Sequence, residues 1–343
     1  MRRGLVPEMG GFRVWGRLSG GWRRGPGVCA RLRHASFGTR ARRQPQPRDA
    51  DPAGAPGWPR PGGLGREELL HALRAALLRR EGPLVTLNKP AGLPVSGKPG
   101  ELTLQSVLPE LSQSLGTGEL HLVRAPGKEP SGLVVLSSCP QTASHLQKFF
   151  IHCRRAQRPT ATYCAVTDGI PSHSEGKIRV ALALAHTNGI SQGVPVKCPS
   201  RKDITEGVRR TLSHFRVMAA GSGCALVQLQ PLTAFPDQLQ VHMVLQLCPV
   251  LGDHTYAARV GTVLGQRFLL PAENAKPRRQ VLGDALLRRL RLPPSQAAQL
   301  PLHLHLHRLL LPGTSSAGAP AELLAPLPPY FSRTLQCLGL PEP

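Results

Sequence analysis

The stretch LVTLNKPAGLPV, residues 84–95, is the part of the chain from which the fold can first be inferred. Residues 84–87 are apolar apart from one β-branched threonine, and this composition predicts a strand. The segment Asn-Lys-Pro-Ala-Gly follows at residues 88–92, and its proline and glycine predict a defined turn. Lys89 either contacts a phosphate at this turn or flanks a purely structural bend, and the sequence leaves both open.

Upstream of this strand, residues 67–80 predict a helix. Leucines and alanines recur there at helical spacing, acids stand in the first turn, and Arg79 and Arg80 stand in the last. This order of charges complements the helix dipole. Gly82 and Pro83 are expected to end the helix.

The N-terminal part of the chain has a different composition. Residues 44–65, QPQPRDADPAGAPGWPRPGGLG, are too rich in Pro, Gly and Ala to bury much apolar surface, and predict a linker. Residues 1–48 hold twelve arginines, no lysine and one acid, with apolar side chains between the arginines and no long apolar core. We therefore predict a mitochondrial transit peptide over residues 1–43 and a matrix location, with a disordered basic RNA-binding arm as the alternative.

The charge of the chain favours polyanionic partners. Its 343 residues carry 43 Lys and Arg against 20 Asp and Glu, a net charge of +23. Such a field attracts RNA first, with DNA or an acidic membrane as alternatives. A spanning helix needs about 18 uninterrupted apolar residues, a run that no window approaches, so no membrane span is expected.

Downstream of residue 95, helices and strands are predicted in irregular order. Residues 141–150 predict a helix, residues 161–167, 213–218 and 225–230 predict strands, and a helical segment follows over 238–247. Without a regular βαβ repeat, this order favours an α+β fold with a mixed sheet. The apolar tail from residue 320 onward is expected to pack on the domain.

Three further patterns have candidate roles. Eight scattered cysteines without a C-x-x-C pair predict reduced, mostly buried thiols. Leu-His alternation at His303, His305 and His307 puts three imidazoles on one face of a predicted strand. Since no fourth ligand accompanies them, a polar strand face is predicted in place of a metal site. The basic residues at 201–202 and 209–210 have two alternative roles: they bind the RNA backbone non-specifically, or they are ordinary solvent-exposed charges.

Four stretches, taken in order, resemble motifs of the RluA-type RNA pseudouridine synthases. They are LVTLNKPAGLPV at 84–95, KEPSGLVVL at 128–136, TYCAVTDG at 162–169 and PLTAFPDQLQVHMVLQLCPVLGD at 231–253. The resemblance implies an α+β domain over residues 66–337, with a mixed, largely antiparallel sheet, flanking helices and a central cleft. It also implies isomerisation of uridine to pseudouridine without metal or organic cofactor.

This chemistry requires a carboxylate and a pocket for a flipped base. The implied reaction detaches uracil from C1′ of the ribose, turns it and rejoins it through C5, with an aspartate as nucleophile or base. The base must leave its stack to enter the pocket. Tyr163 lies on the family's tyrosine strand and is the candidate stacking platform, an ordinary core tyrosine being the alternative.

The family's catalytic aspartate is absent at its expected position. Aligning Ser131 and Gly132 with the family pattern H-R-L-D-x-x-T-S-G puts Gly127 where the aspartate belongs, and no Asp lies between residues 107 and 132. Glu129 and Asp237 are the candidate substitutes.

The family's two later arginines are also missing. Gln240 and Phe235 occupy their positions. Leaving one member of a buried ion pair alone costs roughly 3–5 kcal/mol, so joint loss of aspartate and arginine is typical of a relaxed or repurposed pocket.

The resemblance further implies RNA contacts and alternative functions. The matching positions are Lys89, Arg124, Lys128, Ser131, Gln238 and His242. The expected partner is mitochondrial RNA, messenger or ribosomal, together with RNA-processing or ribosome-assembly proteins. The alternative is a catalytically degenerate RNA-binding factor that supports ribosome assembly or translation, and a third reading is a subunit that binds protein alone.

Overall fold

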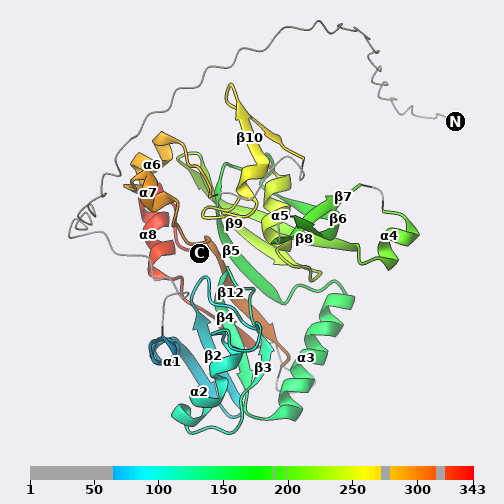
Figure 1. Cartoon of the computed structure of the whole chain (residues 1–343), viewed down its shortest axis with the longest axis vertical. Helices are drawn as coiled ribbons and strands as arrows, with labels where there is room; N and C mark the ends of the chain where they lie inside the picture. Colours follow the sequence, from blue (N-terminus) through cyan, green and yellow to red (C-terminus); the bar gives the residue numbers. More distant parts are fainter. Residues whose placement is uncertain (1–64, 188–189, 198, 272–278, 314–320) are drawn as a thin grey trace, which may run out of the picture. The chain divides into compact units, whose positions relative to one another are not determined.

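The computed structural model describes residues 65–187, 190–197, 199–271, 279–313 and 321–343 (Figure 1). The predicted transit peptide lies outside these residues, as does the predicted linker apart from Gly65. The helices are α1 Arg66–Ala75, α2 Leu108–Leu115, α3 Pro140–Arg155, α4 Arg201–Thr205, α5 Gln238–Leu245, α6 Asp284–Leu290, α7 Pro294–Ala297 and α8 Pro329–Leu338. The strands are β1 Leu77–Glu81, β2 Leu84–Lys89, β3 His121–Arg124, β4 Ser131–Ser137, β5 Ala161–Asp168, β6 Glu175–Thr187, β7 Ile190–Val196, β8 Arg209–Gly221, β9 Cys224–Pro231, β10 Val260–Val263, β11 Gln266–Leu269, β12 Leu304–Leu311 and β13 Ala321–Leu324.

One large sheet organises the described part of the chain. Its strand order is β1-β2-β4-β12-β5-β9-β8-β6-β7, with β3 added to β4 and β13 added to β12. The pairings are antiparallel except between β4 and β12, which run parallel. The predicted mixed, largely antiparallel sheet of an α+β fold is confirmed.

Strand β12 sits in the middle of this sheet although it comes late in the sequence. It separates β4 from β5, although these two strands follow one another along the chain. Gly132 makes this approach feasible, because its φ is +120° and a Cβ there would stand 2.4 Å from the Leu306 carbonyl oxygen.

Helices cover both faces of the sheet (Figure 1). On one face, α3 and α5 pack through residues such as Phe150 and Met243 against Leu133 and Leu306. The opposite face is covered in two places. There α1 and α2 lie on the β2 and β4 end, and α6, α7 and α8 lie over β5 and β9. Adjacent residues of a strand point to opposite faces, so each covered strand is buried on both sides.

The predicted helix over 67–80 was wrong in its second half. Helix α1 ends at Ala75, and residues 77–81 form strand β1, which pairs antiparallel with β2. Gly82, with φ +52°, therefore turns a hairpin and does not end a helix. The apolar residues at 77 and 78 satisfy either pattern, and pairing with β2 decides between them.

The remaining element predictions agree with the structure. Helix α3 contains the predicted 141–150 and extends five residues farther, and β5, β8, β9 and α5 contain or overlap the predicted segments. The tail packs as predicted, with Phe331 and Leu335 fully buried. The described cysteines are free thiols, four of them buried. No described helix has the length and apolar character needed to cross a membrane.

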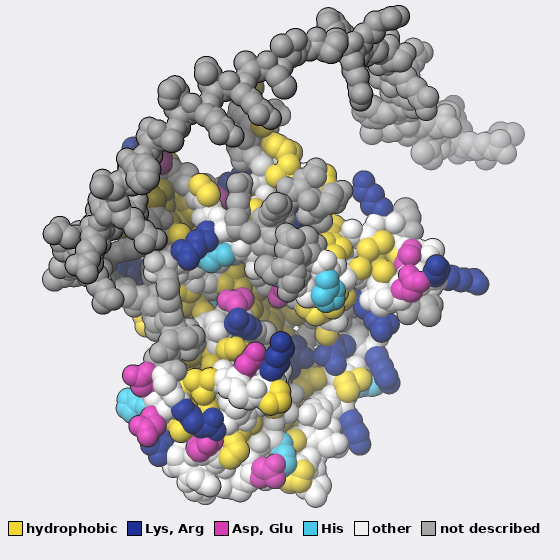
Figure 2. Space-filling view, in the orientation of Figure 1, with side chains coloured by type: hydrophobic (Ala, Val, Ile, Leu, Met, Phe, Trp, Pro, Cys, Tyr) yellow, Lys and Arg dark blue, Asp and Glu magenta, His cyan; other side chains and the backbone are white. Residues whose placement is uncertain are grey.

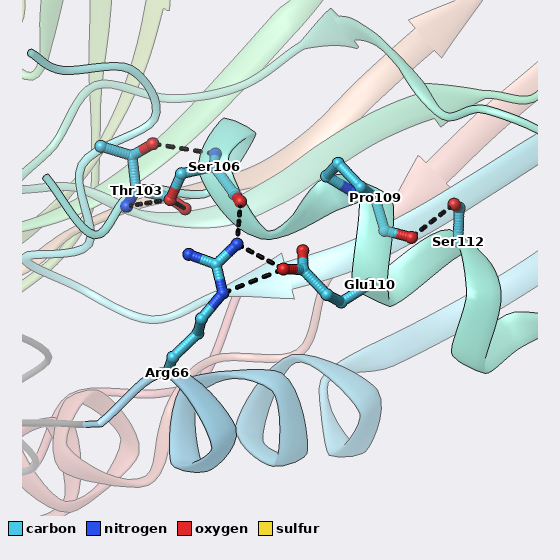
Figure 3. A network of polar contacts seen from close by, with 6 residues as sticks. All are labelled: Arg66, Thr103, Ser106, Pro109, Glu110 and Ser112. Atoms are coloured by element: carbon cyan, nitrogen blue, oxygen red, sulfur yellow. Dashed lines mark hydrogen bonds and ion pairs between the residues drawn. The ribbon is translucent and has the colours of Figure 1, made fainter. Parts of the chain in front are cut away.

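A polar network ties α1 to the segment that leads into α2 (Figure 3). The Arg66 guanidinium donates to the Glu110 carboxylate and to the Ser106 carbonyl, and the Ser106 backbone N–H donates to Thr103 Oγ1 at 3.1 Å. Arg66 lowers the pKa of the Glu110 carboxyl through this hydrogen bond. Both side chains are exposed, so the ion pair orients α1 more than it stabilises the fold.

Candidate active-site cleft

A cleft of about 580 Å³ opens on the face of the sheet that carries α3 and α5. Three chain segments form its walls, namely the β3–β4 connection, the middle of β5 and the β9–α5 connection. These segments belong to three of the motifs singled out in the sequence. Among the residues with predicted roles, those lining the cleft are Arg124, Gly127, Lys128, Tyr163, Phe235, Asp237, Gln238 and Gln240.

Tyr163 forms the floor of the cleft. It sits on β5 and is 8% exposed, with the remainder packed in the main core cluster. Burial raises the pKa of its hydroxyl, so the phenol stays protonated at neutral pH. A neutral aromatic ring that lines a cleft suits stacking on a base.

Arg124 stands beside Tyr163 at the end of β3. Its guanidinium carbon lies 5.2 Å from the centre of the Phe150 ring, an arrangement that holds the side chain in a cation–π contact. Burial lowers the pKa of the guanidinium, and nearby Tyr163 offsets part of this effect. Its buried Nε has no hydrogen-bond partner among the described residues. A half-buried arginine that lines a cleft fits an anionic group such as a phosphate.

Gly127 lines the cleft at the position expected for the aspartate. A Cβ built there would meet the Pro130 Cδ at 3.7 Å, an ordinary contact, and the backbone φ is outside the left-handed region. The local backbone therefore does not require glycine.

Asp237 lines the opposite wall, at the residue before α5. It is exposed and holds a left-handed backbone with φ +52°, a conformation that is uncommon for a residue other than glycine. The fully buried Tyr256 donates its hydroxyl proton to Asp237 Oδ2 at 2.9 Å, while the Gly193 N–H donates to the same hydroxyl oxygen at 2.9 Å. Partial desolvation raises the pKa of Asp237, and the Tyr256 hydrogen bond opposes that rise.

Glu129, the second candidate substitute, does not line the cleft. Its carboxylate lies 3.8 Å from the Lys128 ammonium on the surface, and its carbonyl accepts from the Gly92 N–H. Of the two carboxylates considered in the sequence, the structure brings only Asp237 to the cleft wall.

The two glutamines of α5 are held by protein partners. Gln238 donates to Ser213 Oγ at 2.8 Å and accepts from Thr233 Oγ1 at 2.8 Å, which fastens the β9–α5 connection to β8. Gln240 bonds to the buried Asp253 and lowers its pKa, although burial dominates and raises that pKa to about 6. The residue at the arginine position thus faces a carboxylate inside the protein.

Three residues predicted to contact RNA are fully enclosed. Lys89 is 1% exposed and donates to the carbonyls of Pro90, Leu93 and Lys128, so its role is to fasten the turn and not to meet a phosphate. Burial lowers its pKa to about 7.

Ser131 and His242 are enclosed in the same way. Ser131 Oγ lies 2.9 Å from His305 Nδ1, and His242 Nε2 lies 2.8 Å from Thr211 Oγ1. Both side chains are 0% exposed, so their motif positions serve packing of the sheet.

The sequence did not identify Arg154 as a cleft residue. Arg154 lies in the last turn of α3 and lines the cleft with Arg124 and Lys128. A basic residue in the last turn of a helix complements the dipole, so its position carried no separate signal. Figure 2 shows further Lys and Arg side chains on this side of the molecule, between α4 and α3.

The histidine alternation has an internal role. His303 and His305 are 0% exposed and face α8, not solvent, so the predicted polar face is buried. His303 bonds to Pro301 O and Thr334 Oγ1, and His305 to Ser131 Oγ. The described residues contain no group of three potential metal-ligating side chains.

Comparisons with known proteins relate the whole chain to one family. Residues 83–244 match the family model described as RNA pseudouridylate synthase. The chain is 72% identical over 348 residues to mitochondrial mRNA pseudouridine synthase RPUSD3 of Homo sapiens, covering 99% of both chains. It is 32% identical to the mitochondrial pseudouridylate synthase RPUSD4 of Mus musculus, over 80% of this chain and 72% of that protein. The solved structure of human RNA pseudouridylate synthase domain containing 4 matches with a TM-score of 0.63 and 30% identity, over 81% of this chain and 98% of that one.

Proposed function

Since the chain belongs to the RNA pseudouridylate synthase family, we propose that it converts uridine to pseudouridine in mitochondrial RNA, messenger or ribosomal, within the matrix. One observation supports this most, the cleft in which Tyr163, Arg124 and Asp237 meet. It combines a platform for a flipped base, a half-buried cation and a carboxylate. The isomerisation needs the carboxylate and a platform for the flipped base, and the cation fits a phosphate of the RNA.

We assign the carboxylate role to Asp237. In the reaction, the C1′–N1 bond of uridine breaks, a C1′–C5 bond forms, and the proton lost from C5 is replaced by one on N1. The carboxylate either attacks C1′ and is later displaced, or removes the proton at the 2′ carbon and returns it. The Tyr256 hydroxyl fixes Asp237 at 2.9 Å, which supplies the orientation that such a step requires.

A second candidate function is supported by the same site. Gly127 removes the family carboxylate, and Gln240 is engaged with Asp253. A catalytically degenerate factor that binds RNA and supports ribosome assembly or translation would retain Tyr163 and Arg124 and lack an essential carboxylate.

Variants at three positions separate these functions. Pseudouridine in mitochondrial RNA is mapped with carbodiimide in cells that lack the protein and are rescued with wild type, Asp237→Asn or Tyr163→Leu, the last of which removes the stacking ring. The amide in Asp237→Asn still accepts from Tyr256, so the fold is kept while the carboxylate is lost. We expect modification by Asp237→Asn to fall by about 10²-fold or more, as for loss of an acid–base group.

The matched control is Glu129→Gln, which removes a carboxylate that does not line the cleft. It should modify RNA like wild type. Wild-type levels of pseudouridine with Asp237→Asn would refute the assignment of Asp237. Unchanged pseudouridine after complete loss of the protein would refute the isomerase function and leave the RNA-binding factor.

The matrix location is tested separately through residues 1–43. We expect a chain lacking them to stay in the cytosol, because the arginine-rich, acid-poor composition is what import recognises. Continued import of the shortened chain into mitochondria would contradict the predicted transit peptide.

A further inference from the structure

Among the described residues, helices cover only part of the face of the sheet opposite the cleft. Helices α6 and α8 pack there over Val166 and Leu226, toward one end of β5 and β9. Farther along the sheet, buried and more exposed side chains alternate along β8, so the two faces of this strand differ in burial. Ser213 and Phe215 are buried on the cleft side, whereas Arg216 on the opposite side is exposed and His214 is half-buried. Such alternation is typical of a sheet with one solvated face.

Strand register arranges the polar residues of this face in rows. Lys177 pairs with His214, and His214 pairs with Gln230, so the three side chains cross three strands on one face. The neighbouring row is Glu175, Arg216 and Gln228. Together these six side chains border a hollow of about 450 Å³, which we call the back groove.

Basic side chains line the back groove and continue beyond it on the same face of the sheet. Lys177 and Arg179 on β6 and Arg210 on β8 share this face by their spacing and register, and all three are exposed. The acid here is Glu175, paired with Arg216 at 3.0 Å with both side chains 63% exposed. An exposed pair of this kind contributes little to stability, so a phosphate can replace the carboxylate at small cost.

One residue that lines the back groove, His214, has an unused polar atom. His214 Nε2 is buried and has no hydrogen-bond partner among the described residues. Burial and the neighbouring Lys177 lower the pKa of this imidazole, so at neutral pH the ring is uncharged and can donate or accept. Gln228 and Gln230 add amides beside it. Cations with amides and a neutral imidazole suit a sugar–phosphate chain, in which charged phosphates alternate with hydroxyls.

We propose that the back groove binds the backbone of single-stranded RNA outside the cleft. This inference rests on the proposed function only in taking RNA as the ligand. Arg209 and Arg210 are consecutive residues of β8 and point to opposite faces. They offer cations on both sides of the sheet at one strand end, where a long RNA can pass from the cleft side to the back groove.

The test compares long and short RNA with a charge-reversed groove. The variant Lys177→Glu, Arg179→Glu, Arg210→Glu is titrated with unstructured RNA of about 40 and about 8 nucleotides, the shorter being within the range of a single site. We expect affinity for the long RNA to fall at least about tenfold, and the slope of log affinity against log salt to drop by about 2, since each phosphate contact on a single strand contributes about 0.7. Affinity for the short RNA, which fills the cleft alone, should stay unchanged.

The matched control reverses three exposed cations of the helical layer, Arg288→Glu, Arg289→Glu and Arg333→Glu. This control changes the net charge by the same amount. Its affinity for the long RNA and its slope of log affinity against log salt should both stay near the wild-type values. A neutral variant with glutamine at 177, 179 and 210 should show an intermediate loss, which guards against misfolding. If the groove variant binds long RNA like the control, the proposal is wrong. The proposal is equally wrong if the groove variant keeps its affinity for long RNA and loses only the binding of an acidic protein.

Failure of the groove and failure of the isomerase give different results. An inactive isomerase would leave the length-dependent RNA binding intact, while an absent groove would leave modification of the short RNA intact. The groove variant is therefore also assayed for pseudouridine formation in the short RNA, where wild-type rates are expected.

Discussion

At residue 127 the backbone accepts a side chain that the sequence lacks. A Cβ there makes only an ordinary contact of 3.7 Å, whereas one at Gly132 would stand 2.4 Å from a carbonyl oxygen in a left-handed conformation. Gly127 in the β3–β4 connection and Gly132 in β4 are therefore present for different reasons. Packing requires glycine at residue 132, whereas neither the backbone nor a close contact requires it at residue 127.

We expect Gly127→Asp to change the free energy of unfolding by no more than about 1 kcal/mol, as for a tolerated surface-accessible substitution. Gly132→Ala should cost about 3 kcal/mol or more, because both the clash and the positive φ oppose it. Urea unfolding of both variants checks this contrast. Equal stability losses for the two would show that the loop around Gly127 is more constrained than its contacts indicate.

Lys89 is a structural cation, and its removal should be costly. Lys89→Met keeps most of the side-chain volume but leaves three carbonyls, those of Pro90, Leu93 and Lys128, without their donor. An unsatisfied buried group costs about 1–3 kcal/mol, so we expect a loss of at least about 2 kcal/mol in chemical denaturation. A loss below about 0.5 kcal/mol would contradict this role.

Motifs located the site, but the orientation of individual side chains could not be predicted from the sequence. The structure brings Tyr163, Arg124, Lys128 and Gln238, all singled out in the sequence, to one cleft, while their roles there stay predictions. The sequence could not tell a lysine that contacts ligand from Lys89, which the turn encloses, because burial depends on the loop at 128 folding back over residues 90–93. Asp237 was named only as a candidate, since its position opposite Gly127 depends on the sheet.

At the scale of elements, helices and strands whose sequence has one clear hydrophobic period were predicted correctly. A segment whose sequence fits both helix and strand was not. Helix α3 and strands β5 and β9 have lengths and flanking turns that allow one assignment. Residues 77–81 fit helix or strand, and the pairing with β2 decided the outcome. The histidine segment was correctly read as a strand, but its buried side depended on α8, which comes later in the chain.

The buried histidines should make the fold sensitive to acid. Burial lowers the pKa of His242, His303 and His305 to about 4 from 6.5. Below pH 6.5 the unfolded chain binds protons that the folded chain does not, so stability present above 6.5 is lost as the pH falls toward 4. Each histidine contributes about 3 kcal/mol to this loss. Asp253, with its pKa raised to about 6, binds its proton in the folded chain first, so it adds stability as the pH falls. This gain offsets about the loss from one histidine.

The net loss between neutral pH and pH 4 is then about 6 kcal/mol, comparable to the whole stability of a typical domain. Urea unfolding at pH 7.5, 6.5, 5.5 and 4.5, values chosen about these pKa values, should show a decline that begins below 6.5. The variant His303→Gln, which can still bond to Thr334, should decline less steeply. A free energy of unfolding that stays constant down to pH 5 would contradict the burial of neutral imidazoles.

At the scale of the whole molecule, the C-terminal segment completes the core. Strand β13 and helix α8 supply Leu323, Phe331 and Leu335, which pack in two different core clusters. A chain ending after residue 313 would leave this apolar surface uncovered along with His303 and His305. We expect it to be insoluble or unfolded, as judged by circular dichroism and proteolysis. A cooperatively folded truncated chain would show that α8 is dispensable.

The place of β12 between β4 and β5 also fixes when folding can finish. During synthesis, both of its neighbours leave the ribosome more than a hundred residues earlier, and until residues 304–311 arrive each exposes a bare hydrogen-bonding edge. The nascent protein is thus a pair of incomplete half-sheets for most of its production, prone to sticking to other chains. Holding chaperones should bind it throughout that interval, and a premature stop codon even near the end of the gene should yield a product that quality control removes.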